Sequence, residues 1–324
     1  MNFRTKIEIS ELPFKIDRTS KVLTIGSCFS DSLGHYLAQS KINCLHNPYG
    51  VVSNPVSIFR LLSQSLNKLP VKTNYFTENQ GIWYHYDFHS KHCHQDKSHL
   101  ENELNKLHQD VGEFLKKTDY LIITLGTAFA YRLIHNSYVV ANCHKKEATF
   151  FKKEILSLKE VDIRFRQFYE KLMQVNPKVK LIFTVSPVRH IKDTLQGNSL
   201  SKSILRIASQ QFTEASKNIT YFPSYEILMD DLRDYRYYSE DMIHVNEVGQ
   251  KYVIEHFKKT AFSSELLHFI SEWDQIRNQI NHRPFQSDSE AHQNFLKKLV
   301  LRLEKLRTSV DVANELEMVK AQLI

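Results

Sequence analysis

The sequence has no long apolar run and few of the residues that mark special classes of protein. Only 8 glycines, 8 prolines and 4 cysteines occur among its 324 residues, which excludes a collagen-like chain and a disulfide-dense scaffold. No stretch approaches the roughly 20 apolar residues of a membrane-spanning helix, and the first residues lack the apolar segment of a secretory signal. The cysteines form no CxxC pair. We therefore expect reduced thiols, a cytoplasmic location and no membrane span.

The sequence also has no long segment whose charged residues are all of one sign. The net charge is +7, from 43 Lys and Arg against 36 Asp and Glu, and a basic face would attract nucleic acid. The basic residues alternate with acidic ones, however, and no recognisable nucleic-acid-binding motif is present. We therefore expect no nucleic-acid partner. With 42% hydrophobic and 24% charged residues, the composition is that of an ordinary globular protein.

Apolar runs typical of buried strands alternate with segments of helical periodicity. The apolar runs cover residues 21–25, 119–125, 180–185 and 219–222, and helical spacing covers residues 161–175 and 201–216. This alternation indicates crossover connections and a mostly parallel sheet. We predict a three-layer α/β/α fold of flavodoxin-like type. Ligands of such folds bind at the carboxyl ends of the strands.

Two regions depart from this alternation. Residues 43–99 read as a long irregular segment rich in histidine, and long loops in compact domains are usually functional. From about Phe262 onward the chain is nearly free of glycine and helical, and apolar residues recur there at steps of three and four. Those residues are Leu296, Leu299, Leu303, Leu306, Val310 and Ala313. We predict a first domain over residues 1–262 and a helical extension over residues 263–324. The extension would pack on the domain or form a homodimer through its helix.

A reactive pair of side chains follows the first apolar run, in KVLTIGSCFSDSLG (21–34). A helix is predicted to begin at this point, because Ser30 and Asp31 are typical N-cap residues. A serine on such a strand-to-helix turn lies beside unpaired N–H groups that can hold an anion. Ser27 is therefore a candidate nucleophile, although it could instead only cap the helix. Cys28 competes for the role, but adjacent residues on a sharp turn point in different directions, and we favour Ser27.

A second motif places a carboxylate three residues before a histidine, in SEDMIHVNEVGQKYV (239–253). Asp241 can accept the Nδ1–H of His244 and fix its tautomer, which leaves Nε2 free as a general base. The pair precedes a helix predicted to begin near Asn246. Such a pair is catalytic only beside a nucleophile, and Ser27 is the candidate.

Taken together, these motifs resemble the GSCFA-domain family, which is related to the SGNH/GDSL esterases and acyltransferases. The segments that carry the resemblance are GSCF (26–29), NPYGVVSNP (47–55), GIWYHYDFHS (81–90), ITLGTAFAY (123–131), ANCHK (141–145), TVSPVRH (184–190) and DMIHVN (241–246). The resemblance covers roughly residues 3–262. It implies that Ser27 is the nucleophile, that His244 is its base and that Asp241 orients His244.

The resemblance also implies an oxyanion hole of three donors. In the wider SGNH group these are the N–H of the serine, a glycine N–H from a second block and an asparagine side chain from a third. Gly50 matches the second block, and the third block begins at Gly126. Ala128 stands where the asparagine is expected, and the loss of one donor typically costs about a hundredfold in turnover. We therefore expect a replacement donor. The candidates are Asn47, Asn142 and Thr127.

Several other polar residues have more than one interpretation. A zinc site is one reading of the histidine segment, but its ligand spacing matches no standard zinc pattern. The four residues concerned are His85, His89, Cys93 and His94. We expect no metal and no cofactor, and we expect Trp83, Asp87 and His89 to line a cleft for the acyl substrate. Arg189 and His190 are predicted to bind an anionic group of the substrate; the alternative is an ion pair with one of the acids in DDLRDYR (230–236).

The sequence thus predicts a serine esterase that cleaves a short-chain or acetyl ester through an acyl-enzyme on Ser27. The alternative is an O-acyltransferase that uses the same site to acylate a carbohydrate or polysaccharide hydroxyl. A third hypothesis is a non-catalytic binding module that retains the fold, which Ala128 favours. The expected partner is a small-molecule or carbohydrate acyl ester.

Overall fold

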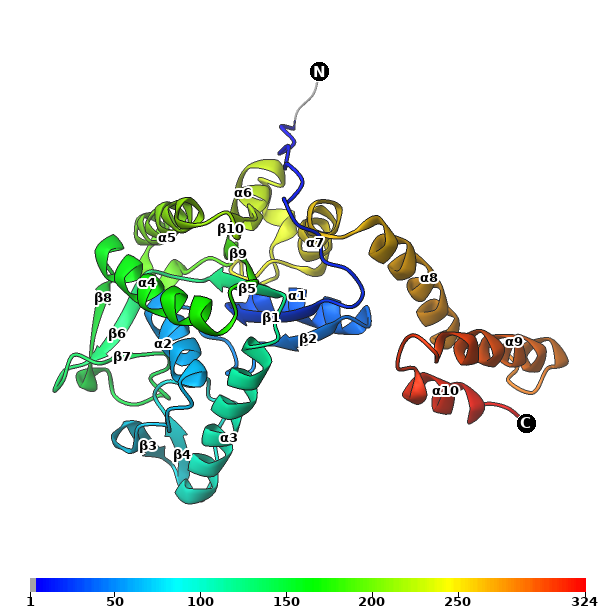
Figure 1. Ribbon diagram of the computed structural model, residues 1–324, viewed down its shortest axis with the longest axis horizontal. Coiled ribbons are helices and arrows are strands. Elements are labelled where there is room, and N and C mark those ends of the chain that lie inside the picture. The colour runs from blue at the N-terminus through cyan, green and yellow to red at the C-terminus, as the bar shows by residue number, and fades with distance from the viewer. Residues whose placement is uncertain (1–3) are drawn as a thin grey trace.

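The computed structural model describes residues 4–324, and a five-stranded sheet lies at its centre (Figure 1). Its strands are β1 (Lys21–Gly26), β2 (Asn43–His46), β5 (Tyr120–Leu125), β9 (Lys180–Val185) and β10 (Ile219–Tyr221). They lie in the order β10-β9-β5-β1-β2, and every neighbouring pair is parallel. Numbered along the chain within this sheet, the order is that of flavodoxin-like folds.

Both faces of the sheet are buried, because successive side chains of each strand point to opposite faces. In β5, Leu121 and Ile123 belong to one core, whereas Tyr120 and Ile122 belong to the other. The first core is covered by α2 (Pro55–Leu66), α3 (Lys97–Leu115), α4 (Leu158–Val175) and α5 (Leu195–Ala215). The second is covered by α1 (Cys28–Gln39) and α7 (Glu247–Ala261). The predicted three-layer α/β/α fold is confirmed.

Two small antiparallel sheets and several short helical turns complete this part of the chain. One sheet pairs β3 (Phe76–Asn79) with β4 (Ile82–His85), and the other has the order β7-β6-β8. The strands of the latter are β6 (Phe129–Leu133), β7 (Val139–Val140) and β8 (Phe151–Ile155). The short turns are η1 (Thr73–Tyr75), η2 (Ala148–Phe150), η3 (Ile191–Asp193), α6 (Ser224–Glu226), η4 (Ile227–Asp231) and η5 (Tyr235–Tyr237).

The irregular segment predicted for residues 43–99 is wrong, since it contains β2, α2, β3 and β4. The helix α2 has ten of its twelve residues buried, and its apolar residues Val56, Phe59, Leu62 and Leu66 recur with helical spacing. Its start does carry a local signal, because Asn54 caps the helix and Pro55 occupies the first helical position.

The C-terminal part is helical, as predicted, and comprises α8 (Ser264–Ile280), α9 (Glu290–Leu306) and α10 (Ala313–Lys320). Figure 1 shows α9 and α10 to one side of the sheet, beyond α8. Two contacts tie these helices to α1 and the turn after it. The indole N–H of Trp273 donates to the carbonyl of Gln39 over 2.8 Å, and Lys41 pairs with Glu315 at 2.7 Å.

The apolar residues that suggested a heptad seam do not lie on one helix. A turn after Leu306 separates α9 from α10, so the regular spacing breaks there. Leu296, Leu299 and Leu303 are buried within their own chain. A homodimer through this extension stays a prediction.

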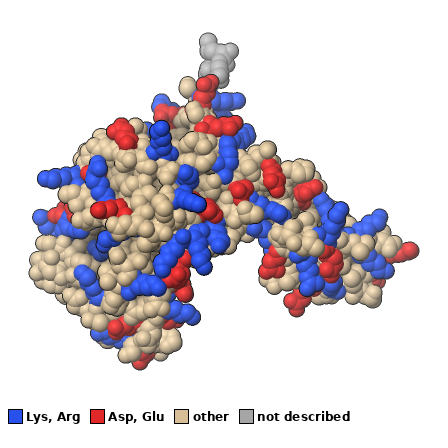
Figure 2. All heavy atoms as spheres, in the orientation of Figure 1, with Lys and Arg blue, Asp and Glu red and all other residues tan. Residues whose placement is uncertain are grey.

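The surface carries both signs of charge. On the face shown in Figure 2, Lys and Arg intermingle with Asp and Glu, including over the C-terminal helices. Within residues 4–324, no helix is both long and apolar enough to cross a membrane.

Candidate active site

The turn after β1 depends on Gly26. Its φ is +137°, and a Cβ at this position would lie 2.1 Å from the carbonyl oxygen of Thr124 in β5. Only glycine therefore fits where β1 and β5 approach each other. The Gly26 N–H donates to Asn47 Oδ1 over 2.9 Å, and its carbonyl accepts from the Val52 N–H at 3.0 Å. These contacts fix the position of Ser27 at the carboxyl edge of the sheet.

Ser27 stands at the N-cap of α1 with an unengaged hydroxyl. The residue is 3% exposed, and among residues 4–324 its Oγ has no hydrogen-bond partner. Its own N–H donates to the Thr124 carbonyl over 3.1 Å. The N–H groups of the first helical turn point out of this end of α1, where the helix dipole favours negative charge. A buried hydroxyl without a partner is rare in folded proteins and needs an explanation.

Asp241 and His244 form a hydrogen-bonded pair on the turn before α7. Nδ1 of His244 donates to Asp241 Oδ2 over 2.6 Å. The other carboxylate oxygen accepts the N–H groups of Ile243 and His244, each at 2.9 Å. These hydrogen bonds, that from the His244 ring above all, lower the pKa of Asp241 to about 2. The ring thus takes the tautomer whose Nε2 has a free lone pair.

A cavity of about 380 Å³ brings Ser27 and His244 together at the carboxyl edge of the sheet. Thr127 and Arg189 line the same cavity. Four of the predicted site residues therefore share one space, and Asp241 joins them through His244. Because Ser27 Oγ has no hydrogen-bond partner within residues 4–324, the two side chains face the cavity without a hydrogen bond between them.

Among the charged residues of the cavity wall, cations outnumber acids: Lys153, Arg189 and Lys192 stand against Asp193. Lys153 pairs with Asp193, whose side chain is 7% exposed, and burial lowers the pKa of Lys153. His190 also lines the cavity; burial lowers its pKa to about 4, with smaller contributions from neighbouring cations. The Arg189 guanidinium lies 5.2 Å from the centre of the Tyr238 ring. Such a wall favours a substrate with a negative or strongly polar group.

Cys28 lines the cavity as well, but its surroundings do not activate it. Burial is the largest cause that raises the pKa of its thiol. A cysteine nucleophile needs the opposite shift, because the thiolate is the reactive form. These surroundings favour Ser27 over Cys28.

Most of the predicted oxyanion donors lie elsewhere. The Gly50 N–H donates to the Asn47 carbonyl over 2.8 Å, and the Gly126 N–H donates to the Ser53 carbonyl over 2.9 Å. Neither glycine belongs to the described cavity lining. Both N–H groups are thus already used in holding loops together.

The predicted side-chain donors are also engaged in local structure. Asn47 accepts from Gly26 and donates to Asp31 at 3.4 Å. Asn142 Oδ1 accepts from the His144 N–H over 2.9 Å. Of the residues predicted to bind substrate or oxyanion, Gly50, Gly126, Asn47, Asn142 and His89 are absent from the described cavity wall. Thr127 is on that wall, and its hydroxyl contacts Ser201 at 3.1 Å.

Asn54 is a cavity residue that the sequence did not point to. It is buried and caps α2 by accepting from the Ser57 N–H over 2.8 Å. Its Nδ2 donates to the Val140 carbonyl over 3.2 Å. An amide nitrogen carries two hydrogens, and the second has no acceptor among the described residues. The only local signal is Asn before Pro, which predicts a helix start and says nothing about a cavity.

Lys202 lies beneath the cavity and was not predicted either. It is 1% exposed, and its Nζ donates to the carbonyls of Gly126 at 2.6 Å and Ser186 at 2.7 Å. Burial lowers the pKa of Lys202 to about 7. The side chain therefore ties the loop after β5 to the loop after β9, and both loops contribute to the cavity wall.

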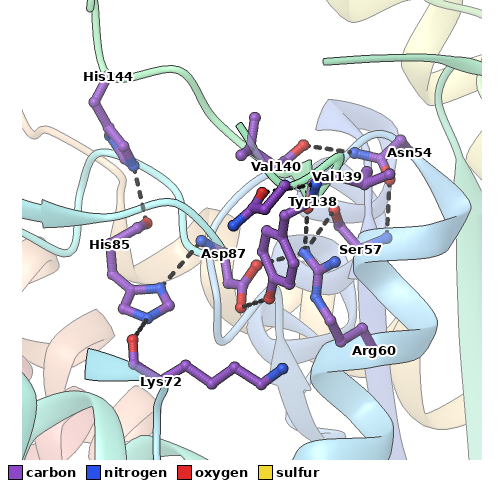
Figure 3. Close-up of polar contacts among 11 residues, drawn as sticks. Asn54, Ser57, Arg60, Lys72, His85, Asp87, Tyr138, Val139, Val140 and His144 are labelled. Carbon is purple, nitrogen blue, oxygen red and sulfur yellow. Dashed lines mark hydrogen bonds and ion pairs between the residues drawn. The ribbon is translucent and has the colours of Figure 1, made fainter. Parts of the chain in front are cut away.

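The histidine segment builds a hydrogen-bonded scaffold away from the cavity (Figure 3). His85 Nδ1 accepts from the Asp87 N–H at 3.1 Å, and Nε2 donates to the Lys72 carbonyl at 3.0 Å. His144 Nε2 in turn donates to the His85 carbonyl at 2.9 Å. In the part of the chain that the structure describes, no three His, Cys, Asp or Glu side chains are placed to hold a metal ion.

Asp87 does not line the cleft, contrary to the prediction. Its carboxylate accepts hydrogen bonds from Arg60 and from the hydroxyl of Tyr138, the latter over 2.7 Å. Figure 3 shows these three side chains together, beside β7. The reason is electrostatic, because a buried carboxylate needs a cation and donors, and Arg60 supplies the cation from α2.

Comparison with known proteins places this chain in a family. The model of the GSCFA family matches residues 21–257, and the model of the GSCFA domain protein C-terminal domain matches residues 273–324. The chain belongs to the GSCFA family, which confirms the resemblance found in the sequence. No curated protein matches it.

Two solved structures are similar at low identity. A protein from Streptococcus pneumonia, provisionally described as a platelet activating factor, is 12% identical, with a TM-score of 0.37 over 74% of this chain and 83% of its own. A family 3 carbohydrate esterase from Clostridium thermocellum is also 12% identical, with a TM-score of 0.36 over 78% and 98% of the two chains. Both likenesses are too weak to bear on function.

Proposed function

We propose that this protein is a serine esterase that forms an acyl-enzyme on Ser27. The main support is Ser27, which lines the same cavity as His244 and whose buried hydroxyl lacks a hydrogen-bond partner within residues 4–324. A nucleophile, a base and a group that orients the base are the parts that acyl transfer requires. Asp241 supplies the third part through its 2.6 Å hydrogen bond to His244.

The reaction runs in two halves. Ser27 Oγ attacks the ester carbonyl while its proton passes to His244 Nε2, and that proton then goes to the leaving alkoxide as the C–O bond breaks. Water next attacks the acyl-enzyme, His244 takes its proton, and the acid leaves as Ser27 regains a proton. Asp241 stabilises the imidazolium that forms in each half.

The oxyanion is held differently from the arrangement that the resemblance implied. The Ser27 N–H is directed to the Thr124 carbonyl, so it is a poor donor to the substrate. We assign the role to the first N–H groups of α1 and to the second Nδ2 hydrogen of Asn54, which lies on the cavity wall. Asn54 would then take the role of the asparagine that is expected at position 128, where this chain has alanine. Dipoles fixed in advance are the efficient way to stabilise a developing oxyanion.

The cavity favours a small acyl group and a polar leaving portion. A volume of about 380 Å³ is at the small end for ligand pockets, which suits an acetyl or short-chain ester. Arg189 stands on the wall and would bind an anionic group of the substrate. These features support the short-chain specificity that the sequence suggested.

Turnover of p-nitrophenyl acetate tests the proposal. The wild-type protein should hydrolyse it with saturation kinetics, and Ser27→Ala and His244→Ala should each lose activity while they keep the wild-type circular dichroism spectrum. Asp241→Ala should lose less, because the ring keeps part of its orientation. Cys28→Ala is the matched control and should stay active. Activity that survives in Ser27→Ala would refute the assignment.

A further inference from the structure

A second pocket, of about 690 Å³, lies across β7 from the candidate active site. Val139 lines this pocket, whereas its neighbour Val140 lines the cavity that contains Ser27. Adjacent residues of a strand point to opposite faces, so β7 separates the two spaces. The other walls of the second pocket come from α2, α4 and the turn between β6 and β7.

The charged residues of this second pocket are nearly all basic. Five are cations and one, Glu170, is an acid. The cations are Arg60, Lys72, Arg132, Arg164 and Lys171. They come from α2, the loop that follows it, β6 and α4. Residues far apart in the sequence thus bring positive charge to one pocket, whereas charges intermingle on the face shown in Figure 2.

Two of these cations are fixed in place by carboxylate partners, of which Asp87 is buried and Glu154 and Glu160 are partly exposed. Arg60 pairs with Asp87, and its guanidinium lies 4.2 Å from the centre of the Tyr138 ring. Figure 3 shows the three side chains side by side. Arg132 pairs with Glu154 and holds both oxygens of Glu160 at 2.7 Å. These partners do not line the pocket, so they hold the guanidinium groups from behind.

The other three cations have no such partner. Within residues 4–324, no carboxylate forms an ion pair with Lys72, Arg164 or Lys171. The only side-chain hydrogen bond of Arg164 in this part of the chain goes to Gln167, at 3.4 Å. Three like charges around one space repel each other, and an anion between them removes that repulsion. The Lys72 ammonium lies 5.6 Å from the centre of the Tyr138 ring, beside the space that such an anion would fill.

The floor of the pocket is apolar. Val56 and Phe59 line it and are almost fully buried. Tyr138 adds the edge of an aromatic ring, because Tyr75, at 3.7 Å between centroids, and Arg60 cover its two faces. A cationic rim over an apolar and aromatic floor matches a molecule with a phosphate at one end and an apolar or planar group at the other.

We propose that this pocket is a second binding site, for a small organic phosphate. Lys72, Arg164 and Lys171 bind the phosphate oxygens, and the remainder of the molecule packs on Phe59 and Val56. A phosphate suits the site better than a single carboxylate, because its charge and three oxygens can engage cations from several elements at once. A pocket of about 690 Å³ suits a small molecule better than a nucleic-acid strand, which needs an extended basic groove.

Isothermal titration calorimetry with phenyl phosphate and with inorganic phosphate, at constant ionic strength, tests this proposal. The full-length protein should bind phenyl phosphate saturably and more tightly than inorganic phosphate, because only the former reaches the apolar floor. The double variant Arg164→Gln/Lys171→Gln should bind it at least about tenfold more weakly, since each lost charged contact has roughly that effect. Both residues lie outside the candidate active site, so ester turnover is not affected by the substitution itself.

Lys159→Gln is the matched control, since Lys159 is exposed on the same helix and does not line the pocket. This variant should bind phenyl phosphate as the wild type does. Equal affinity in the double variant and the wild type would overturn the proposal, because binding would then occur elsewhere. The absence of saturable binding to the wild type would overturn it as well.

Discussion

Replacement of Gly26 by alanine is expected to destabilise the fold at the position that presents Ser27. The φ of +137° lies in a region that other residues adopt only at a cost of about 1–3 kcal/mol. The new methyl group would also lie 2.1 Å from the carbonyl oxygen of Thr124, in the middle of the central sheet. Relief of such overpacking typically costs about 1–3 kcal/mol more. We therefore expect Gly26→Ala to lower the free energy of unfolding by about 2–6 kcal/mol.

Gly81→Ala separates the two contributions. Gly81 also has a positive φ, of +78°, but a Cβ there would meet nothing within 4 Å. This variant should therefore lose only the conformational part, about 1–2 kcal/mol. Urea unfolding followed by circular dichroism compares the two variants with the wild type. Equal losses in both variants would show that contact with β5 is not what demands glycine at position 26.

Three further predictions concern the surroundings of the site. Burial lowers the pKa of Lys202 from 10.5 to about 7. Between pH 7 and pH 10.5 the folded chain therefore binds fewer protons than the unfolded chain, and the free energy of unfolding rises with pH. Relative to Lys202→Met, the wild type should gain about 2 kcal/mol of unfolding free energy between pH 7 and pH 9; a flat difference in urea unfolding would contradict this. Asn54→Ser keeps an N-cap but loses the amide donor, so kcat for p-nitrophenyl acetate should fall about a hundredfold, and an unchanged kcat would remove Asn54 from the oxyanion hole. EDTA should leave that turnover intact, whereas loss of activity that zinc restores would reverse our expectation of a metal-free site.

Local sequence patterns were sufficient for the parts of the fold that rest on local properties. The buried strand β9 occupies the predicted residues 180–185, because an unbroken apolar run suits a strand covered on both faces. The helix α7 begins at Glu247, close to the start predicted near Asn246, and Asn246 caps it. In contrast, α2 was not predicted although its apolar residues recur with helical spacing. Its polar residues Ser57 and Gln64 are buried as well, because neighbouring elements cover the helix, and no local pattern reveals that.

The residues of the candidate site likewise fall into those that a local motif predicts and those that depend on tertiary packing. Ser27, Asp241 and His244 could be proposed because each belongs to a short motif whose chemistry depends on neighbours in the sequence. Asn54 could not, since its place on the cavity wall depends on how α2 packs beside β7. Asn47 was a plausible donor by residue type alone. Its amide is used instead in a long-range hydrogen bond to Gly26, which no local pattern reveals.

Labelling with a fluorophosphonate tests the central claim most directly, because this reagent reacts with a serine only where a base and an oxyanion site activate it. Mass spectrometry of the digested full-length protein should place the label on Ser27. Labelling should be lost in Ser27→Ala and strongly slowed in His244→Ala, and it should persist in Cys28→Ala. A label on Cys28, or an unlabelled Ser27 in a protein that still hydrolyses p-nitrophenyl acetate, would contradict the account.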